Sequence, residues 1–125
     1  MYELSVYEDF DAAHYIKGYN GPCARMHGHR WRVYAKWQWS ELDELGIAYD
    51  LVVLKKDLRA ILREFDHQNL NEVLVLNATA ENLAYTIYKL LRVLPPGDRL
   101  VSVSVNETPE TCVTYSQEDT DETQT

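Results

Sequence analysis

The clearest pattern along the chain is the alternation of apolar and polar positions over residues 27–39. Successive side chains of a strand point to opposite faces of a sheet, so this alternation predicts a strand with one buried face. That face holds two histidines followed by apolar side chains: His27, His29, Trp31, Val33, Ala35, Trp37 and Trp39. The predicted strand therefore carries two imidazoles at the beginning of its buried face.

Residues 2–14 alternate in the same way and predict a second long strand. One of its faces holds Glu8 together with apolar residues and a histidine: Tyr2, Leu4, Val6, Phe10, Ala12 and His14. A segment rich in turn residues, 15–26, separates the two strands. If the strands pair antiparallel, the end of the first lies beside the start of the second. His14, His27 and His29, called the histidine trio below, then converge on one side of the sheet.

Two later stretches carry apolar residues at helical spacing. The first follows Asp50, whose carboxylate can accept hydrogen bonds from the free N–H groups of the first turn, and runs to the segment 66–71. The second follows Thr79, which we interpret as its N-cap, and ends before Pro95.

Two further strands are predicted at residues 100–107 and 111–115. The order ββααββ predicts an α+β fold with a four-stranded antiparallel sheet and two helices on one face. We assign residues 1–115 to this single domain. Residues 116–125 are acidic or polar throughout, so we expect a disordered tail. An open edge and a half-covered sheet favour a homo-oligomer, through closure of a barrel.

The composition describes an acidic chain of 125 residues with a net charge of −8. Negative charge argues against nucleic acid or a membrane surface as a partner. We find no apolar run of the roughly 18 residues that a membrane helix needs, and we expect no signal peptide. The chain has only two cysteines, one of them close to two histidines, so we expect a cytoplasmic protein rather than a disulfide framework.

The histidine trio predicts a metal site. Neutral imidazoles crowded together would leave acceptors unpaired, and crowded imidazolium ions would repel each other. A divalent metal resolves both problems. Three nitrogen ligands with an open fourth position favour a catalytic Zn²⁺.

Two other groups have both a structural and a catalytic interpretation. Cys23 lies four residues before His27. It is either a fourth ligand that closes a structural zinc site or a base or nucleophile held near the metal. Asp66 and His67 end the first helix, where His67 either caps the helix or forms a carboxylate–imidazole proton relay. In the second case all four histidines of the chain would serve one site.

Glu107 continues the apolar face of the third predicted strand, and a charge on such a face needs a partner. The partner is either an arginine or a ligand with two neighbouring donors, such as a pterin or guanine ring. Thr79 fits a helix cap better than a contact with a ligand.

Five motifs, in this order, resemble those of the 6-pyruvoyl-tetrahydropterin synthase / 6-carboxytetrahydropterin synthase family. They span the chain up to its tail: Phe10–His14, Cys23–His29, Asp66–Asn71, Asn77–Glu81 and Asn106–Thr108. The resemblance implies the tunnelling fold, whose subunits join their sheets into a barrel with active sites at subunit interfaces. We therefore expect a trimer or hexamer.

The resemblance also implies roles for individual residues. The histidine trio would bind zinc, and Cys23 would be a catalytic base with Asp66 and His67 as relay partners. Glu107 would grip the pterin ring, and Thr79 is a weaker candidate for substrate binding. The family substrate is 7,8-dihydroneopterin triphosphate, whose phosphates need cations. Three basic residues are candidates for this role: Lys17, Arg25 and Lys55.

Three residues separate Cys23 from His27, which resembles the bacterial 6-carboxytetrahydropterin synthases of the queuosine and 7-deazapurine pathway. Those enzymes form 6-carboxy-5,6,7,8-tetrahydropterin and release acetaldehyde and triphosphate. A pyruvoyl-forming or sepiapterin-cleaving enzyme of the same fold is the nearest alternative. A non-catalytic, zinc-containing binder of pterins or purines and a zinc hydratase are alternatives of other classes.

Overall fold

The computed structural model describes residues 1–117, so the predicted tail lies outside the described residues from position 118 onward. Two long strands come first, and helices and shorter strands follow. Their bounds are β1 Tyr2–His14, β2 His27–Trp39, α1 Leu51–Leu62, β3 Gln68–Asn69, α2 Leu70–Val73, α3 Ala80–Arg92, β4 Leu100–Asn106 and β5 Val113–Tyr115. Short 3₁₀ helices lie at Pro22–Ala24 (η1) and Gly97–Arg99 (η2).

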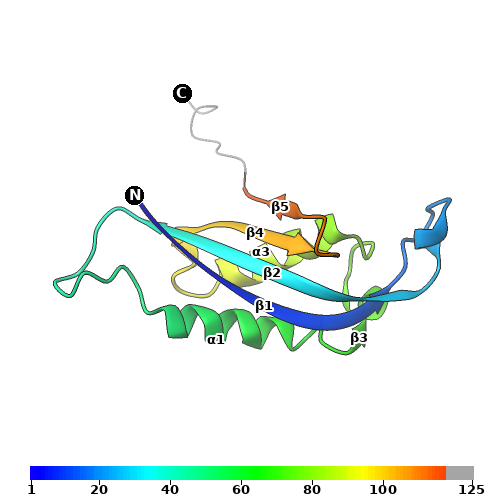
Figure 1. Ribbon diagram of the computed structural model, residues 1–125, viewed down its shortest axis with the longest axis horizontal. Helices are drawn as coiled ribbons and strands as arrows, with labels where there is room; N and C mark the ends of the chain where they lie inside the picture. Colours follow the sequence, from blue (N-terminus) through cyan, green and yellow to red (C-terminus); the bar gives the residue numbers. More distant parts are fainter. Residues whose placement is uncertain (118–125) are drawn as a thin grey trace, which may run out of the picture.

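The strands form one sheet in the order β3-β1-β2-β4-β5, with α1 and α3 on one side (Figure 1). β1 and β2 pair antiparallel over their full lengths, from Tyr2 opposite Trp39 to His14 opposite His27. β4 pairs antiparallel with β2, and β5 with β4. The predicted antiparallel arrangement of these four strands, with both long helices on one face, is confirmed.

The sheet differs from the prediction at one edge, because it has five strands rather than four. β3 is only two residues long and runs parallel to β1, with Ala12 opposite Gln68 and Ala13 opposite Asn69. A strand this short has no alternation to read in the sequence. The single-turn helix α2 follows it directly.

The core lies between the sheet and the two long helices. The inward residues of β2 include Trp31 and Trp37, which are almost completely buried. They pack in one cluster with the inner faces of the helices, such as Leu58 of α1 and Ile87 of α3. Alternation along the strands therefore directs the apolar side chains, and the histidines that share their face, toward this core.

Both predicted helix caps are present. The Asp50 carboxylate accepts a hydrogen bond of 2.9 Å from the Val52 N–H. The Thr79 hydroxyl accepts one of 3.1 Å from the Asn82 N–H. These caps fix where α1 and α3 begin.

The other face of the sheet is polar. Arg32 donates two hydrogen bonds to the Asp9 carboxylate, at 2.8 and 3.1 Å, and holds the pKa of that carboxyl below its usual range. The neighbouring pair of Arg30 and Asp11 approaches to 3.2 Å. In the part of the chain that the structure describes, no helix combines the length and the apolar character needed to cross a membrane.

Candidate metal centre and its neighbouring groups

The pairing of β1 with β2 brings the histidine trio together. His14 lies directly opposite His27, and His29 lies opposite Ala12, two residues before His14. Alternation places all three side chains on one face. Their ring centroids are 4.5 Å apart for His14 and His27, 4.8 Å for His27 and His29, and 5.4 Å for His14 and His29.

Two of the three rings are oriented by backbone carbonyls. The Nδ1 atom of His14 lies 2.6 Å from the carbonyl oxygen of Ala78, and that of His27 lies 2.6 Å from the carbonyl oxygen of Arg25. A carbonyl only accepts, so each Nδ1 carries the proton and donates it. The Nε2 atom of each ring is thereby left as the metal-binding nitrogen, in the arrangement that protein metal sites commonly use.

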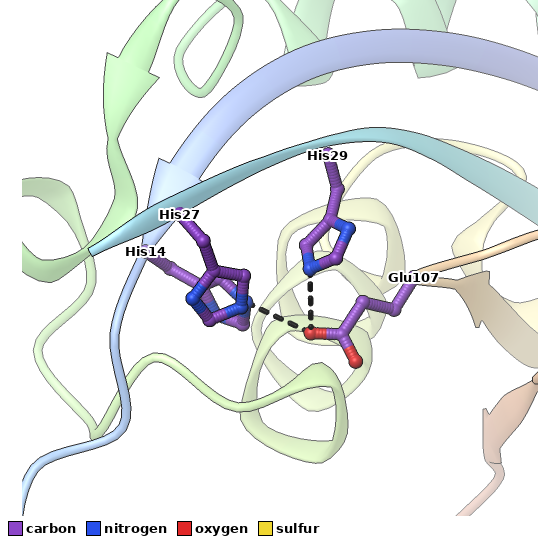
Figure 2. Close-up of side chains that lie close together, drawn as sticks. All are labelled: His14, His27, His29 and Glu107. Carbon is purple, nitrogen blue, oxygen red and sulfur yellow. Dashed lines mark ion pairs between the residues drawn. The ribbon is translucent and has the colours of Figure 1, made fainter. Parts of the chain in front are cut away.

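Glu107 joins the trio from the end of β4 (Figure 2). Its Oε2 atom lies 2.8 Å from Nε2 of His14 and 3.4 Å from Nε2 of His29. One ligand atom from each of the four residues lies within 4.8 Å of the other three. The predicted alternative, an ion pair between Glu107 and an arginine, is wrong. Within residues 1–117 the ion-pair partners of Glu107 are histidines.

This group fits a metal ion by its chemistry. His14 is fully buried, and the buried Nε2 atoms of His14 and His29 form no hydrogen bond within the described residues, although the Glu107 carboxylate lies beside both. Burial is the main cause that lowers the pKa of His29, and the Glu107 carboxylate opposes that shift. Imidazole Nε2 atoms beside a carboxylate are a donor set that a divalent cation would satisfy.

Cys23 does not belong to this group. It lies in η1, inside the loop between β1 and β2, and its thiol is partly buried and free. Its backbone carbonyl accepts a hydrogen bond of 2.8 Å from the N–H of Ile16, which holds the two ends of the loop together. Neither group of clustered metal-type ligands in the described chain includes its sulfur.

Asp66 and His67 form a second group with Asp11, called the edge group below. Nδ1 of His67 lies 3.0 Å from Oδ1 of Asp66. The same oxygen accepts a 3.0 Å hydrogen bond from the backbone N–H of Asp11, which is the main cause that lowers the pKa of Asp66. His67 is 77% exposed and has a φ of 59°. Within one chain, His67 therefore lies outside the group formed by the other three histidines.

Two cavities border Glu107. One of about 240 Å³ lies beside the start of α3 and is also lined by Thr79 and Cys112. The other, of about 610 Å³, lies on the polar face and is also lined by His29 and Arg32. Thr79 is thus both the observed cap of α3 and a neighbour of Glu107.

The three cations proposed for phosphate binding differ in their surroundings. Lys55 lies 3.6 Å from the Glu8 carboxylate and hydrogen-bonds to the carbonyl of Tyr7. Lys17 and Arg25 lie at the two ends of the Cys23 loop, and neither has a carboxylate partner within the described chain.

The sequence analysis missed the approach of Glu107 to the trio. The alternation along β4 did indicate that Glu107 points to the same face as the inward residues of this strand. β4 pairs with β2, which carries His29. What the sequence does not give is where β4 ends relative to His29.

Comparisons with known proteins agree with this geometry. A family model described as 6-pyruvoyl tetrahydropterin synthase matches residues 3–118. A 6-carboxy-5,6,7,8-tetrahydropterin synthase of Synechocystis is 37% identical and covers 85% of this chain and 86% of its own length. A Bacillus subtilis protein of the same name is 32% identical, with 91% and 84% covered.

A solved structure gives a similar result. The 6-pyruvoyl tetrahydropterin synthase of Caenorhabditis elegans superposes with a TM-score of 0.83 at 27% sequence identity. The superposition covers 94% of this chain and 96% of that one. It confirms the α+β tunnelling fold that the motifs implied for the subunit.

Proposed function

Because the chain belongs to the 6-pyruvoyl tetrahydropterin synthase family, we propose that it is a 6-carboxy-5,6,7,8-tetrahydropterin synthase. It would convert 7,8-dihydroneopterin triphosphate to 6-carboxy-5,6,7,8-tetrahydropterin and release acetaldehyde and triphosphate. Two relatives above 30% identity carry this name. The observation that carries the proposal is the convergence of three Nε2 atoms beside a carboxylate that lines two cavities.

The histidine trio would hold Zn²⁺. The carbonyl groups of Ala78 and Arg25 support this role, because they fix two rings with Nε2 directed at the group. A zinc ion there supplies Lewis acidity toward the side-chain hydroxyls of the substrate. Glu107 would anchor the pterin ring by accepting two N–H donors, which fixes the orientation of the substrate.

Proton transfer would fall to Cys23, Asp66 and His67. Asp66 holds Nδ1 of His67, so its Nε2 remains available to take or give a proton. His67 is exposed at the edge of the sheet and lies outside the trio of its own chain. We therefore propose that His67 serves the site of a neighbouring copy, in a trimer or hexamer with active sites at the interfaces.

The outer edge of β1 supports such an assembly. Only Ala12 and Ala13 pair with β3 on that side, while the rest of this 13-residue strand has no strand neighbour there in the described chain. Free backbone donors and acceptors along an edge are a template for pairing with another copy. We also propose that the reaction serves queuosine or 7-deazapurine biosynthesis in the cytoplasm, where thiols such as the free Cys23 and Cys112 stay reduced.

Product analysis tests the proposal. Purified protein is incubated with Zn²⁺ and 7,8-dihydroneopterin triphosphate, and the products are identified by mass spectrometry. We expect 6-carboxy-5,6,7,8-tetrahydropterin together with acetaldehyde. Cys23→Ala is the control variant, and we expect it to keep its zinc and lose turnover. Loss of zinc in that variant would instead make Cys23 a structural ligand.

The nearest alternative is formation of 6-pyruvoyl-tetrahydropterin, which the structural match to the Caenorhabditis elegans protein favours. If the assay yields 6-pyruvoyl-tetrahydropterin and no acetaldehyde, our proposal is wrong and this alternative is correct. Tight pterin binding without any turnover would identify a non-catalytic binding protein.

A further inference from the structure

Beyond Ala13, the edge of β1 that faces away from β2 has no strand to pair with. β3 accompanies β1 only as far as Ala13 opposite Asn69, and the next residues turn into α2. Two asparagine side chains take the place of the missing strand. An asparagine amide has one carbonyl acceptor and N–H donors in one plane, like a peptide group.

Asn71 pairs with Tyr15 in this way. Its Oδ1 accepts a 2.9 Å hydrogen bond from the Tyr15 N–H, and its Nδ2 donates one of 2.9 Å to the Tyr15 carbonyl. Asn71 is two residues beyond Asn69, and Tyr15 is two residues beyond Ala13, so the register of the β1–β3 pair is continued.

Asn77 does the same for Lys17. Its Oδ1 accepts a 3.1 Å hydrogen bond from the Lys17 N–H, and its Nδ2 donates one of 3.1 Å to the Lys17 carbonyl. The backbone of Asn77 is itself held, because its carbonyl accepts from the Asn82 side chain of α3 at 3.0 Å. The next residue, Ala78, provides the carbonyl that orients His14.

Ile16 lies between the two clamped residues and faces the opposite way. Its N–H donates to the Cys23 carbonyl at 2.8 Å. The contacts therefore run without a break from the two asparagines, through residues 15–17, to the backbone of Cys23. Hydrogen bonds on both edges of this segment leave it little freedom to shift.

We propose that Asn71 and Asn77 are positioning residues that set the location of the Cys23 thiol relative to the histidine trio. The proposal rests on the proposed function for the catalytic role of Cys23, but the placement of the thiol can be measured without turnover. Loss of either amide would let residues 15–17 move and carry Cys23 with them. A displacement of about 1 Å at a reacting group is enough to cost on the order of 10²-fold in rate.

The test uses Asn71→Leu and Asn77→Leu, which keep the branched shape of the side chain and remove its hydrogen bonds to Tyr15 or Lys17. Asn77→Leu also removes the 3.1 Å hydrogen bond that Asn77 Oδ1 accepts from the Ala78 N–H. The rate of alkylation by iodoacetamide is measured at Cys23 across a pH series, with each cysteine followed by peptide mass spectrometry. Cys112 is exposed and lines the same small cavity as Ile16, so its alkylation is followed as well but is not used as the reference. Asn20→Ala is the matched control, because this exposed asparagine of the same loop makes no side-chain hydrogen bond within residues 1–117.

In both leucine variants we expect the alkylation rate of Cys23 to change about tenfold and its pH profile to shift, because thiol reactivity follows the surroundings of the sulfur. Cys23 of the Asn20→Ala protein should match the wild type. The zinc content should stay constant, and kcat should fall about 10²-fold with little change in KM.

Two further outcomes decide the proposal. An unchanged rate and pH profile at Cys23, with only a lower melting temperature, would overturn it and leave the asparagines a structural role. If a leucine variant fails to fold, Asn71→Asp and Asn77→Asp replace it, because they keep the acceptor and lose the donor; an unchanged Cys23 there would overturn the proposal equally. Absence of turnover in the wild type would refute the proposed function and leave the alkylation result valid.

Discussion

The histidine trio and the edge group both start from the last four residues of β1, yet they are built in opposite ways. His14 faces the core, is fully buried, and is oriented by a carbonyl. Asp11, three residues earlier, faces the other side of the sheet and contacts Asp66 and His67 through its backbone. Parity along one strand therefore places His14 in a group with a buried member, and Asp11 in a group whose imidazole is exposed.

The difference shows what each group can do alone. Oriented ligands favour metal binding, and within one chain backbone carbonyls orient two rings of the trio, His14 and His27. The edge group has a fixed backbone, but its imidazole is exposed in a left-handed conformation. Such a conformation in a residue other than glycine is uncommon and often marks a functional position. We interpret the trio as a ligand set supplied by one chain. We interpret the edge group as one that acts only when it contacts another copy of the chain.

The largest expected effect separates the two groups by metal content. His29→Ala should lose its bound zinc, from about one ion per chain to on the order of a tenth or less, because two imidazoles rarely hold this ion. Turnover should fall to background. Zinc is measured by atomic emission after dialysis, with His67→Ala as the matched control that keeps its metal. A stoichiometric zinc content in His29→Ala would reject the trio as the ligand set.

A second prediction separates chemistry from folding at the edge group. His67→Ala and His67→Gly should both lower kcat by about 10² to 10⁴-fold, as expected when a proton-transfer group is removed. The glycine variant should be more stable than the alanine variant by about 1 kcal/mol, because glycine adopts the positive φ of this position without strain. Kinetics and urea denaturation measure the two effects. Equal stabilities would show that the conformation carries no strain.

A third prediction tests whether Glu107 belongs with the ligands or with the substrate. Glu107→Gln should raise KM about 10 to 100-fold, because a charge-assisted hydrogen bond contributes about 1.5–3 kcal/mol. The zinc content should not change. If zinc is lost and KM is retained, Glu107 is a fourth ligand and the anchor role is wrong.

The smallest expected effect concerns acid stability at the edge group. The folded-state pKa of Asp66 lies below its ordinary value of 3.8, mainly because of the Asp11 N–H. A carboxyl of this kind stabilises the fold above pH 3.8 and loses that contribution as the pH falls through its folded-state pKa. Asp66→Asn should therefore be less stable than wild type at pH 7, by at most about 0.5 kcal/mol because the side chain is exposed and screened by solvent.

Urea denaturation at pH 7 and at pH 3 measures this difference. The gap between the two proteins should close at the lower pH. A gap that is constant with pH would show that the Asp66 charge does not stabilise the fold.

Periodic features were accessible from the sequence. The alternation of residues 2–14 and 27–39 predicted the strand pair and the side of the sheet on which the histidines lie. The caps at Asp50 and Thr79 were predicted because their chemistry is local. Each of these features depends on spacing within a few residues, which the sequence displays directly.

The remaining features depend on contacts between distant segments that share no period. Asn71 and Asn77 reach across more than fifty residues to bond with the loop. The two-residue strand β3 and the approach of Glu107 to His14 depend on where other elements end. His67 is separated from the trio because it lies beside Asp11, which does not share a face with His14. The contact between Asp11 and His67 joins residues far apart in the sequence, so it is visible only in the folded structure.

The histidines and Cys23 come from different parts of the β1–β2 hairpin, and this has a consequence for how the site can change between members of the family. The imidazoles are supplied by the strands, whereas the thiol is supplied by the connection between them. Insertions or deletions in this connection can move the thiol while the paired strands keep the histidine trio in place. A change in the length of this one hairpin connection can therefore move the thiol without altering the register of β1 and β2.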